Sequence, residues 1–459
     1  MSDAIRSALR DLLPGGAVLP GPSPSSWPAD TPPPVAVLAP TSEVQLAAVM
    51  ERASRAGGRV LPAGLCTWLG GSGTPEVDLV LSTRNLRHVE GYEPADLTFT
   101  SGAGIPWRDL QELTAANGQW LPLDPPGFGA GSLGGVVATG VSGPLRHAFG
   151  APRDHVLGVT LVSGDGRILK WGGRVVKNVA GFDVTRLSIG SWGALGVITS
   201  VSARLFPLPE ADATLLLRAP TAEELLPLAR AMALSSLPLS AVELLDPLKG
   251  VWPGRGSLER TGSGPGRRIG GEVPGASGGA ALVLRILGSE TQAREMEARV
   301  MRDLAGEAVA AGVGVLALRG PESAAFHEAL GEWEMGAALV LRMSLLPSLL
   351  EALLGEAREL AARFGAMGLA GHVGWGTLRV AFRQVPTEGE EARNLTRALG
   401  ELRRRLEAAR GSLVLSQGPS GLLKEVGARG TAGPEVRLMR GLKEEFDPAG
   451  ILSPGRFGL

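Results

Sequence analysis

The spacing of hydrophobic positions changes near residue 210 and divides the chain into two regions. In the first region, short apolar runs alternate with glycine-rich stretches, which is typical of short strands joined by loops. A helix is predicted from Ser42, which forms a capping box with Gln45, to a stop at Gly57. The apolar runs around it at 35–38, 59–61 and 78–81 predict a small β-α-β-β unit at the start of the ordered chain. The run at 97–101 predicts another strand.

The rest of this region continues with short elements. Pro106 and Gly118 bracket a second helix. Residues 156–162 and 167–171 alternate in polarity around Ser-Gly-Asp-Gly, which predicts a β-hairpin. A last strand is expected at 197–206. We therefore expect residues 35–209 to form one α+β unit.

The second region has longer periods. Strands that alternate with helices apolar on one face predict an antiparallel sheet covered by helices on one side. The expected helices lie at 221–236, 289–311, 321–334, 347–364 and 388–409. The expected strands lie at 214–217, 281–287, 314–318, 337–343, 378–382 and 413–415. This second α+β domain is placed at 210–440.

Composition narrows the classes of function. Residues 14–34 are rich in Pro, Gly and Ser, so 1–34 is expected to be a flexible tail, and the composition of 253–279 predicts a disordered insertion. The net charge is −1, which argues against nucleic acid or an anionic membrane as partner. The N-terminus lacks the apolar run of a signal peptide, and charges interrupt the most apolar later stretch, so we expect a cytoplasmic protein. The single cysteine, Cys66, excludes an internal disulfide framework.

Three stretches carry no charged side chain: 62–71, 125–143 and 190–203. Glycine lets backbone approach a ligand closely, and successive amide N–H groups can bind a pyrophosphate without a lysine. The pattern therefore indicates a bound dinucleotide, with plain loop packing as the alternative. Glycines 129, 131 and 134 match the Rossmann spacing, but Asp-Pro-Pro-Gly precedes them where that motif requires a strand.

Two motifs carry a resemblance to a known family. Residues 172–187 (GGRVVKNVAGFDVTRL) and 190–199 (GSWGALGVIT) resemble the FAD-binding subunits of bacterial glycolate oxidases. These belong to the flavoproteins that share the fold of vanillyl-alcohol oxidase and p-cresol methylhydroxylase. Residues 446–456 (FDPAGILSPGR) match the usual chain end of that family. The resemblance implies a two-part FAD-binding domain at 35–209, an α+β cap at 210–440, and a segment at 441–459 that returns to the FAD domain.

The resemblance also assigns cofactor contacts. It implies FAD contacts at Pro62, Gly64, Leu65, Thr67, Leu69, Gly70, Gly71, Gly131, Ser132, Leu133, Gly134, Gly135, Ala138, Thr139, Gly143, Arg153, Asp154, Gly193, Gly196, Val197 and Ile198. Arg146 and Lys177 are the cations nearest these motifs, either for the N1–C2 edge of the flavin or for surface salt bridges. Many relatives attach FAD through a histidine in the first loop, and this loop has none, so non-covalent FAD is implied. Cys66 is interpreted as a buried thiol, with flavin attachment as the alternative.

The sequence departs from the family in the cap. Relatives with their own metal site resemble H-x-G-D-G-N-x-H, whereas this chain reads HVGWGTLR from His372 to Arg379. Arginine has no lone pair to donate, so a two-histidine metal site cannot form, and we expect no metal. The later E-H-G motif is absent from 418–421, and Trp192 stands where relatives carry Glu. His372 is then structural or catalytic, and Arg342 is a candidate for binding a substrate carboxylate bidentately.

These motifs imply a function in a complex. The chain is expected to be the FAD-binding subunit of a glycolate oxidase-type complex that oxidises a small 2-hydroxy acid, glycolate or D-lactate. Its partners would be a catalytic FAD-containing subunit and an iron–sulfur subunit, because no cysteine cluster here can hold such a centre. Membrane contact would be indirect, through partners. The alternatives are a self-sufficient, metal-free oxidase of another small substrate and a non-catalytic scaffold subunit.

Overall fold

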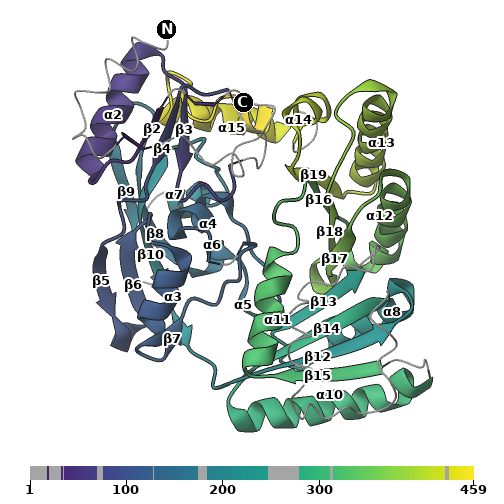
Figure 1. The fold of residues 1–459 in the computed structure, drawn as a ribbon. Coiled ribbons are helices and arrows are strands. Elements are labelled where there is room, and N and C mark those ends of the chain that lie inside the picture. The colour runs from purple at the N-terminus through teal and green to yellow at the C-terminus, as the bar shows by residue number, and fades with distance from the viewer. Residues whose placement is uncertain are drawn as a thin grey trace. The chain divides into compact units, whose positions relative to one another are not determined.

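The computed structural model describes residues 18–19, 33–34, 36–69, 76–127, 129–173, 183–246, 279–310, 314–428 and 434–458. The chain divides into two compact units, each with its own hydrophobic clusters (Figure 1). The first unit comprises Met1–Ser142, Ala151–Leu208 and Thr431–Leu459, and the second comprises Gly143–Gly150 and Pro209–Gly430. The predicted tail and insertion lie almost wholly outside the described residues.

The first unit opens with a four-stranded sheet in the order β1-β2-β4-β3, in which β2, β3 and β4 run parallel. The strands are β1 (Val18–Leu19), β2 (Ala36–Leu38), β3 (Val60–Ala63) and β4 (Leu79–Ser82). Helix α2 (Glu43–Ala56) begins after Ser42, whose Oγ accepts a hydrogen bond from Gln45 N, and ends at Gly57 with a left-handed φ of 64°. The Gln45 side chain accepts from Thr41 N, so the reverse half of the expected capping box is displaced by one residue.

A five-stranded antiparallel sheet follows, in the order β5-β6-β10-β8-β9. Its strands are β5 (Val89–Glu93), β6 (Thr98–Gly102), β8 (Val156–Val162), β9 (Ile168–Gly172) and β10 (Val197–Arg204). Around it lie η1 (Pro94–Asp96), α3 (Trp107–Ala115), α4 (Leu133–Thr139), α6 (Pro152–His155), α7 (Val184–Ser188) and the pair β7 (Gln119–Trp120) and β11 (Phe206–Pro207). The hairpin β8–β9 forms as predicted. Strand β5 was not predicted, because its sequence VEGYE has no apolar alternation.

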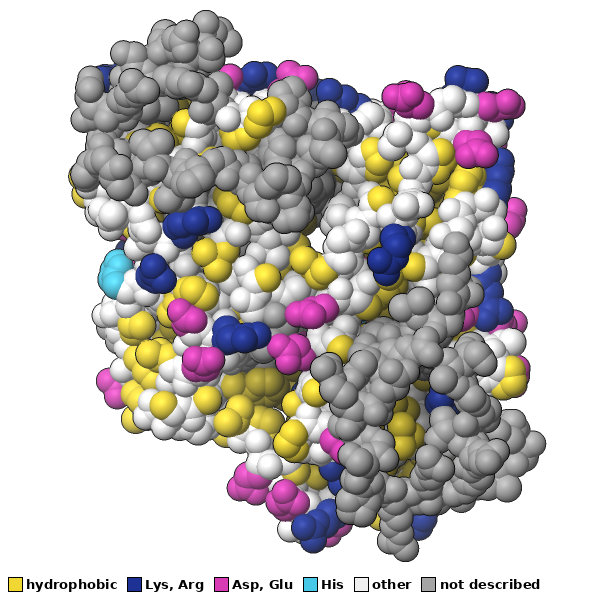
Figure 2. All heavy atoms as spheres, viewed as in Figure 1, with side chains coloured by type: hydrophobic (Ala, Val, Ile, Leu, Met, Phe, Trp, Pro, Cys, Tyr) yellow, Lys and Arg dark blue, Asp and Glu magenta, His cyan; other side chains and the backbone are white. Residues whose placement is uncertain are grey.

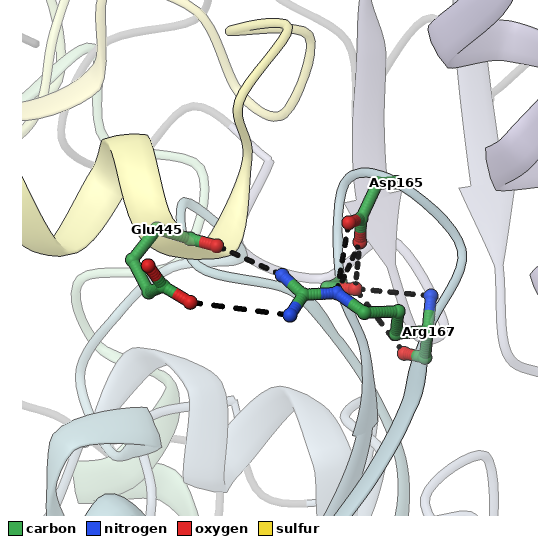
Figure 3. A network of polar contacts seen from close by, with 4 residues as sticks. Asp165, Arg167 and Glu445 are labelled. Carbon is green, nitrogen blue, oxygen red and sulfur yellow. Dashed lines mark hydrogen bonds and ion pairs between the residues drawn. The ribbon is translucent and has the colours of Figure 1, made fainter.

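Helix α15 (Pro434–Phe446) and the residues after it, to the short η4 (Arg456–Gly458), pack into this first unit. Figure 3 shows Arg167, in the β8–β9 turn, between Asp165 and the last turn of α15. Its Nη2 donates to Glu445 O at 2.9 Å, and its Nε pairs with Asp165 at 2.8 Å. Further along, Leu452 lies beside Val60 in a parallel bridge, so the segment extends the first sheet.

The second unit is built on an eight-stranded antiparallel sheet in the order β15-β12-β14-β13-β17-β18-β16-β19. The strands are β12 (Ala211–Ala219), β13 (Ala241–Asp246), β14 (Ala280–Gly288), β15 (Gly314–Arg319), β16 (Leu339–Ser344), β17 (Gly368–His372), β18 (Thr377–Phe382) and β19 (Ser412–Gln417). The helices are α5 (Arg146–Phe149), α8 (Ala222–Leu234), α10 (Glu290–Ala310), α11 (Pro321–Glu332), α12 (Leu350–Phe364), α13 (Gly389–Ala408) and α14 (Ser420–Val426), with the short turns η2 (Pro347–Leu349) and η3 (Val373–Trp375). Strands β13 and β17 were missed, because acidic residues interrupt the first and glycines the second.

Helices α8, α10, α12 and α13 pack on one face of this sheet, as predicted, and bury the leucines that point to it. Helix α11 is the exception. Its Phe326 and Leu330 pack against Leu216 and Val283, which point to the opposite face. The expectation of helices on one side only is therefore wrong for α11, whose sequence does not show which face it covers.

The surface mixes charges of both signs. On the face drawn in Figure 2, basic and acidic side chains lie interspersed between apolar ones wherever side chains are coloured. Among the helices of the described residues, none combines the length and apolarity needed to cross a membrane.

A buried polar network joins α11 to β12. Thr214 Oγ1 lies 2.7 Å from Ser323 Oγ and 2.9 Å from His327 Nε2. Ser323 donates to Asp212, which also receives two hydrogen bonds from Arg285. Burial, reinforced by the positive charge of Arg285, holds the pKa of His327 well below its usual 6.5.

This burial predicts a pH-dependent stability. In the unfolded chain His327 takes up a proton as the pH falls through about 6.5, whereas in the folded chain it stays neutral to much lower pH. The unfolded state then binds more protons, so the free energy of unfolding falls by up to about 1.4 kcal/mol per pH unit below that point. His327→Gln, which keeps a partner for Thr214, is expected to flatten this slope in urea unfolding between pH 7 and pH 5. The exposed His88→Gln is the control. An unchanged slope in His327→Gln would contradict the assignment.

Candidate cofactor site

A cavity of about 600 Å³, counting its open mouth, lies in the first unit. Three segments form it: the loop after β3, the start of α4 and the turn before β10. The lining residues are Pro62, Ala63, Gly64, Leu65, Cys66, Thr67, Trp68, Leu69, Thr83, Ser132, Gly134, Gly135, Ala138, Thr139, Trp192, Gly193, Gly196, Val197, Ile198 and Arg456. The three uncharged segments of the sequence therefore meet around one space.

The glycines of these segments let the walls pack against each other. A Cβ on Gly64 would lie 2.0 Å from Ser132 Oγ, so only glycine fits there. Ser132 also caps α4 by accepting a hydrogen bond from Gly135 N at 3.2 Å. Thr67 Oγ1 donates to Ala130 O and ties the first loop to the second segment. Close packing, the alternative to ligand approach, thus explains part of the glycine pattern.

Two non-glycine lining residues have left-handed backbone: Cys66, with φ of 67°, and Trp192, with φ of 52°. Such angles are uncommon for L-residues and disfavoured for a bulky side chain, and they persist only where surrounding contacts fix them. The Trp192 carbonyl accepts from Arg456 Nη1 at 3.3 Å and from Ser453 Oγ at 3.4 Å. Burial raises the pKa of the Cys66 thiol, so the reactive thiolate is disfavoured.

Most of the predicted cofactor contacts line this cavity. Of the others, Leu133 is buried in the core beneath α4, and Gly131 packs under the Trp68 ring. Arg153 is exposed, and Asp154 accepts from Ala151 N within α6. Gly143 and Arg146 belong to the second unit. Gly70, Gly71 and Lys177 lie outside the described residues.

The sequence analysis missed several lining residues, namely Ala63, Cys66, Trp68, Thr83, Trp192 and Arg456. Four of these stand inside or beside the charge-free segments. Thr83 had no sequence signal. Arg456 closes the chain-end motif that had been recognised, so its place in the motif was the available signal. It is also the only charged side chain among the described lining residues.

In the second unit, His372 and Glu243 form a buried pair. They face each other across β17 and β13, and His372 Nδ1 hydrogen bonds with Glu243 Oε1. Glu243 is 1% exposed and His372 is 8% exposed. The sequence analysis did not identify Glu243 as a partner of His372, because β13 was not predicted. A carboxylate only accepts, so Nδ1 is the donor in this pair, and Glu243 fixes the orientation of the ring.

Arg342 lies on the same face of the sheet as His372, two strands away, directly opposite Arg379. Arg379 is paired with Glu334 at 3.0 Å. Arg342 makes no hydrogen bond or ion pair with any described residue. Its burial and the nearby charges of Arg146 and Arg379 lower the pKa of Arg342. A guanidinium in this setting favours an anionic partner.

Among the described residues, no three His, Cys, Asp or Glu side chains gather as metal ligands.

Comparison with protein families matches residues 34–172 to an FAD binding domain and residues 208–457 to the C-terminal domain of FAD linked oxidases. The second match alone covers more than half of the chain. The chain belongs to the FAD-linked oxidases. FAD is the cofactor, and the predicted α+β architecture with an FAD-binding domain of the p-cresol methylhydroxylase type is confirmed.

Individual relatives match this chain either over one part of it or over nearly all of it. The glycolate oxidase subunit GlcE of Escherichia coli (strain K12) is 40% identical over 144 residues, 31% of this FAD-linked oxidase and 41% of the relative. The chain thus spans about two fifths of the first curated relatives it matches. A D-2-hydroxyglutarate dehydrogenase of Xanthomonas citri pv. viticola is 26% identical over 93% of this chain and 89% of its own. An alkyldihydroxyacetonephosphate synthase structure has the same fold, with a TM-score of 0.64 at 17% identity, over 93% of this chain and 78% of its own.

The cavity fits the cofactor. Three of its lining side chains have buried N–H groups without a hydrogen-bond partner: Trp68 Nε1, Trp192 Nε1 and Arg456 Nε. Buried donors without acceptors are costly, and FAD is rich in acceptors along its pyrophosphate. The unpaired donors and the uncharged backbone walls are those expected of a site for this dinucleotide.

A valine at Gly135 is expected to empty the site. A Cβ there lies 3.1 Å from the Trp68 ring and 3.3 Å from Ser132 Oγ, and the branches of valine add bulk at this wall. Gly135→Val should reduce the flavin content of purified protein about tenfold while the circular dichroism spectrum stays the same. Gly355→Val, in α12 with open space around it, is the matched control. Full flavin content in Gly135→Val would show that Gly135 serves packing alone.

The flavin is expected to be bound without a covalent bond. Acid precipitation should release FAD into the supernatant, because the first loop has no histidine and burial keeps the Cys66 thiol protonated. Absorption of the supernatant and the pellet measures the outcome. Flavin that stays in the pellet of the wild type but not of Cys66→Ala would instead identify Cys66 as the attachment site.

Proposed function

We propose that this chain is the FAD-binding subunit of a glycolate oxidase-type complex that oxidises small 2-hydroxy acids, glycolate or D-lactate. The similarity to glycolate oxidase subunit GlcE carries the proposal, because the two chains are 40% identical over 144 residues and this chain has a fitting FAD cavity. Relatives named D-lactate dehydrogenase and D-2-hydroxyglutarate dehydrogenase support the same substrate class. The partners would be a catalytic flavoprotein subunit and an iron–sulfur subunit.

The second unit also carries groups that would serve a 2-hydroxy acid if this chain itself oxidised it. When bound, FAD would supply the hydride acceptor for that oxidation. The carboxylate of a 2-hydroxy acid suits Arg342, which has no anionic partner among the described residues. The hydroxyl proton suits His372 Nε2, because Glu243 holds the opposite ring nitrogen as a donor. Loss of the hydride and of the proton converts the 2-hydroxy acid to a 2-oxo acid.

A self-sufficient oxidase is the second candidate, and one observation favours it. The Glu243–His372 pair gives this chain an oriented base without any metal, so the groups missing from the relatives' metal motif are not all needed. The two candidates differ in whether the chain turns over substrate by itself.

Turnover by the isolated chain decides between them. With glycolate or D-lactate and an artificial electron acceptor, we expect negligible activity from the chain alone. We expect activity after co-expression with a flavoprotein subunit that has the complete metal motif. In that complex Gly135→Val should remove most of the activity, and His372→Ala should cost less than threefold. Robust turnover by the isolated chain, lost in both His372→Ala and Glu243→Gln, would overturn the subunit proposal in favour of the self-sufficient oxidase.

A further inference from the structure

Arg456 is a buried cation in the wall of the FAD cavity. Its side chain is 4% exposed, although arginine is rarely buried without a charged partner. Its hydrogen-bond partners are both neutral carbonyls: Leu69 O at 2.7 Å, in the first loop, and Trp192 O at 3.3 Å, before β10. Arg456 therefore joins two walls of the cavity that are far apart in sequence.

This guanidinium is only partly satisfied. Its Nε is buried and has no acceptor, and no carboxylate forms an ion pair with it among the described residues. Its charge lies 5.2 Å from the centre of the Trp192 ring, which offsets part of the loss of solvent. Burial lowers the pKa of Arg456 to about 9, so the group is still cationic at neutral pH. A buried, unpaired charge of this kind is costly unless an anion completes it.

The rest of the C-terminal segment fixes Arg456 in place. Lys443 Nζ donates to Ala194 O and Leu452 O and pairs with Asp447, and all three contacts are buried. Asp447 in turn accepts from the backbone N–H groups of Ile451 and Leu452. The segment carries its own internal ion pair, so the charge of Arg456 is not used to dock it.

FAD brings the missing anion. Its pyrophosphate is its only group with formal negative charge in the oxidised state, and the other described lining residues of the cavity are uncharged. We propose that Arg456 binds the pyrophosphate of FAD, so that the C-terminal segment forms the charged wall of the cofactor site. Guanidinium and phosphate oxygens form short, charge-assisted hydrogen bonds, and Nε is free to make one. This inference rests on FAD binding and not on the proposed substrate.

The test compares ligands with and without phosphate. Protein freed of flavin is titrated with FAD and with riboflavin, by flavin fluorescence, for the wild type, Arg456→Gln and Arg456→Lys. We expect Arg456→Gln to weaken FAD at least tenfold and riboflavin less than twofold, with Arg456→Lys between wild type and Arg456→Gln for FAD. Where riboflavin binds too weakly to measure, ADP and adenosine are compared as competitors of FAD binding, which again contrasts a ligand with phosphate and one without.

Ser453→Ala is the matched control. It removes a hydrogen bond to the same Trp192 carbonyl without changing charge, and it should leave the affinity for FAD within twofold of the wild type. If Arg456→Gln fails to fold, Arg456→Lys decides, since it keeps the charge and loses the planar fork. Unchanged affinity for FAD in the arginine variants would overturn the proposal. Equal losses for FAD and riboflavin would overturn it as well, because they would show that Arg456 only supports the walls.

Discussion

The first unit depends on the way its C-terminal segment is fastened to the walls of the cavity. Lys443 and Asp447 neutralise each other in a buried pair and use their remaining hydrogen-bonding capacity on backbone groups. Leu452 then lies beside Val60 at the end of the parallel sheet. With the segment anchored in this way, Arg456 can hold the Trp192 carbonyl and so the unfavourable backbone of Trp192. The shape of the cavity is therefore set by residues beyond its own loops.

The sequence predicted the elements whose pattern is local. Helix α2 formed between its predicted cap and stop, and the hairpin β8–β9 formed around its turn, because neighbouring residues determine both. Strands β5, β13 and β17 were not predicted, because pairing with other strands stabilises them although their own sequences lack an apolar alternation. The cavity loops were predicted because freedom from charge and richness in glycine can be read directly. Thr83 gave no such signal.

The polar face of the second unit shows why its candidate site was only partly foreseen. Glu243, Arg342, His372 and Arg379 come from four strands, and the antiparallel register places them on one face. His372 and Arg342 drew attention through short motifs. Glu243 did not, because an acidic residue in an apolar run does not by itself indicate a functional role. Its burial is understandable only with the imidazole beside it.

The bond between Arg456 and Leu69 has a consequence for the order of biosynthesis. The two residues are separated by 387 positions in the chain. At the usual pace of a ribosome, the first loop is translated roughly 20 to 80 seconds before its arginine partner. During that interval the cavity lacks the wall that contains Arg456, while most of the second unit is translated. The wall that contains Arg456 is therefore added only after the intervening domain has been translated.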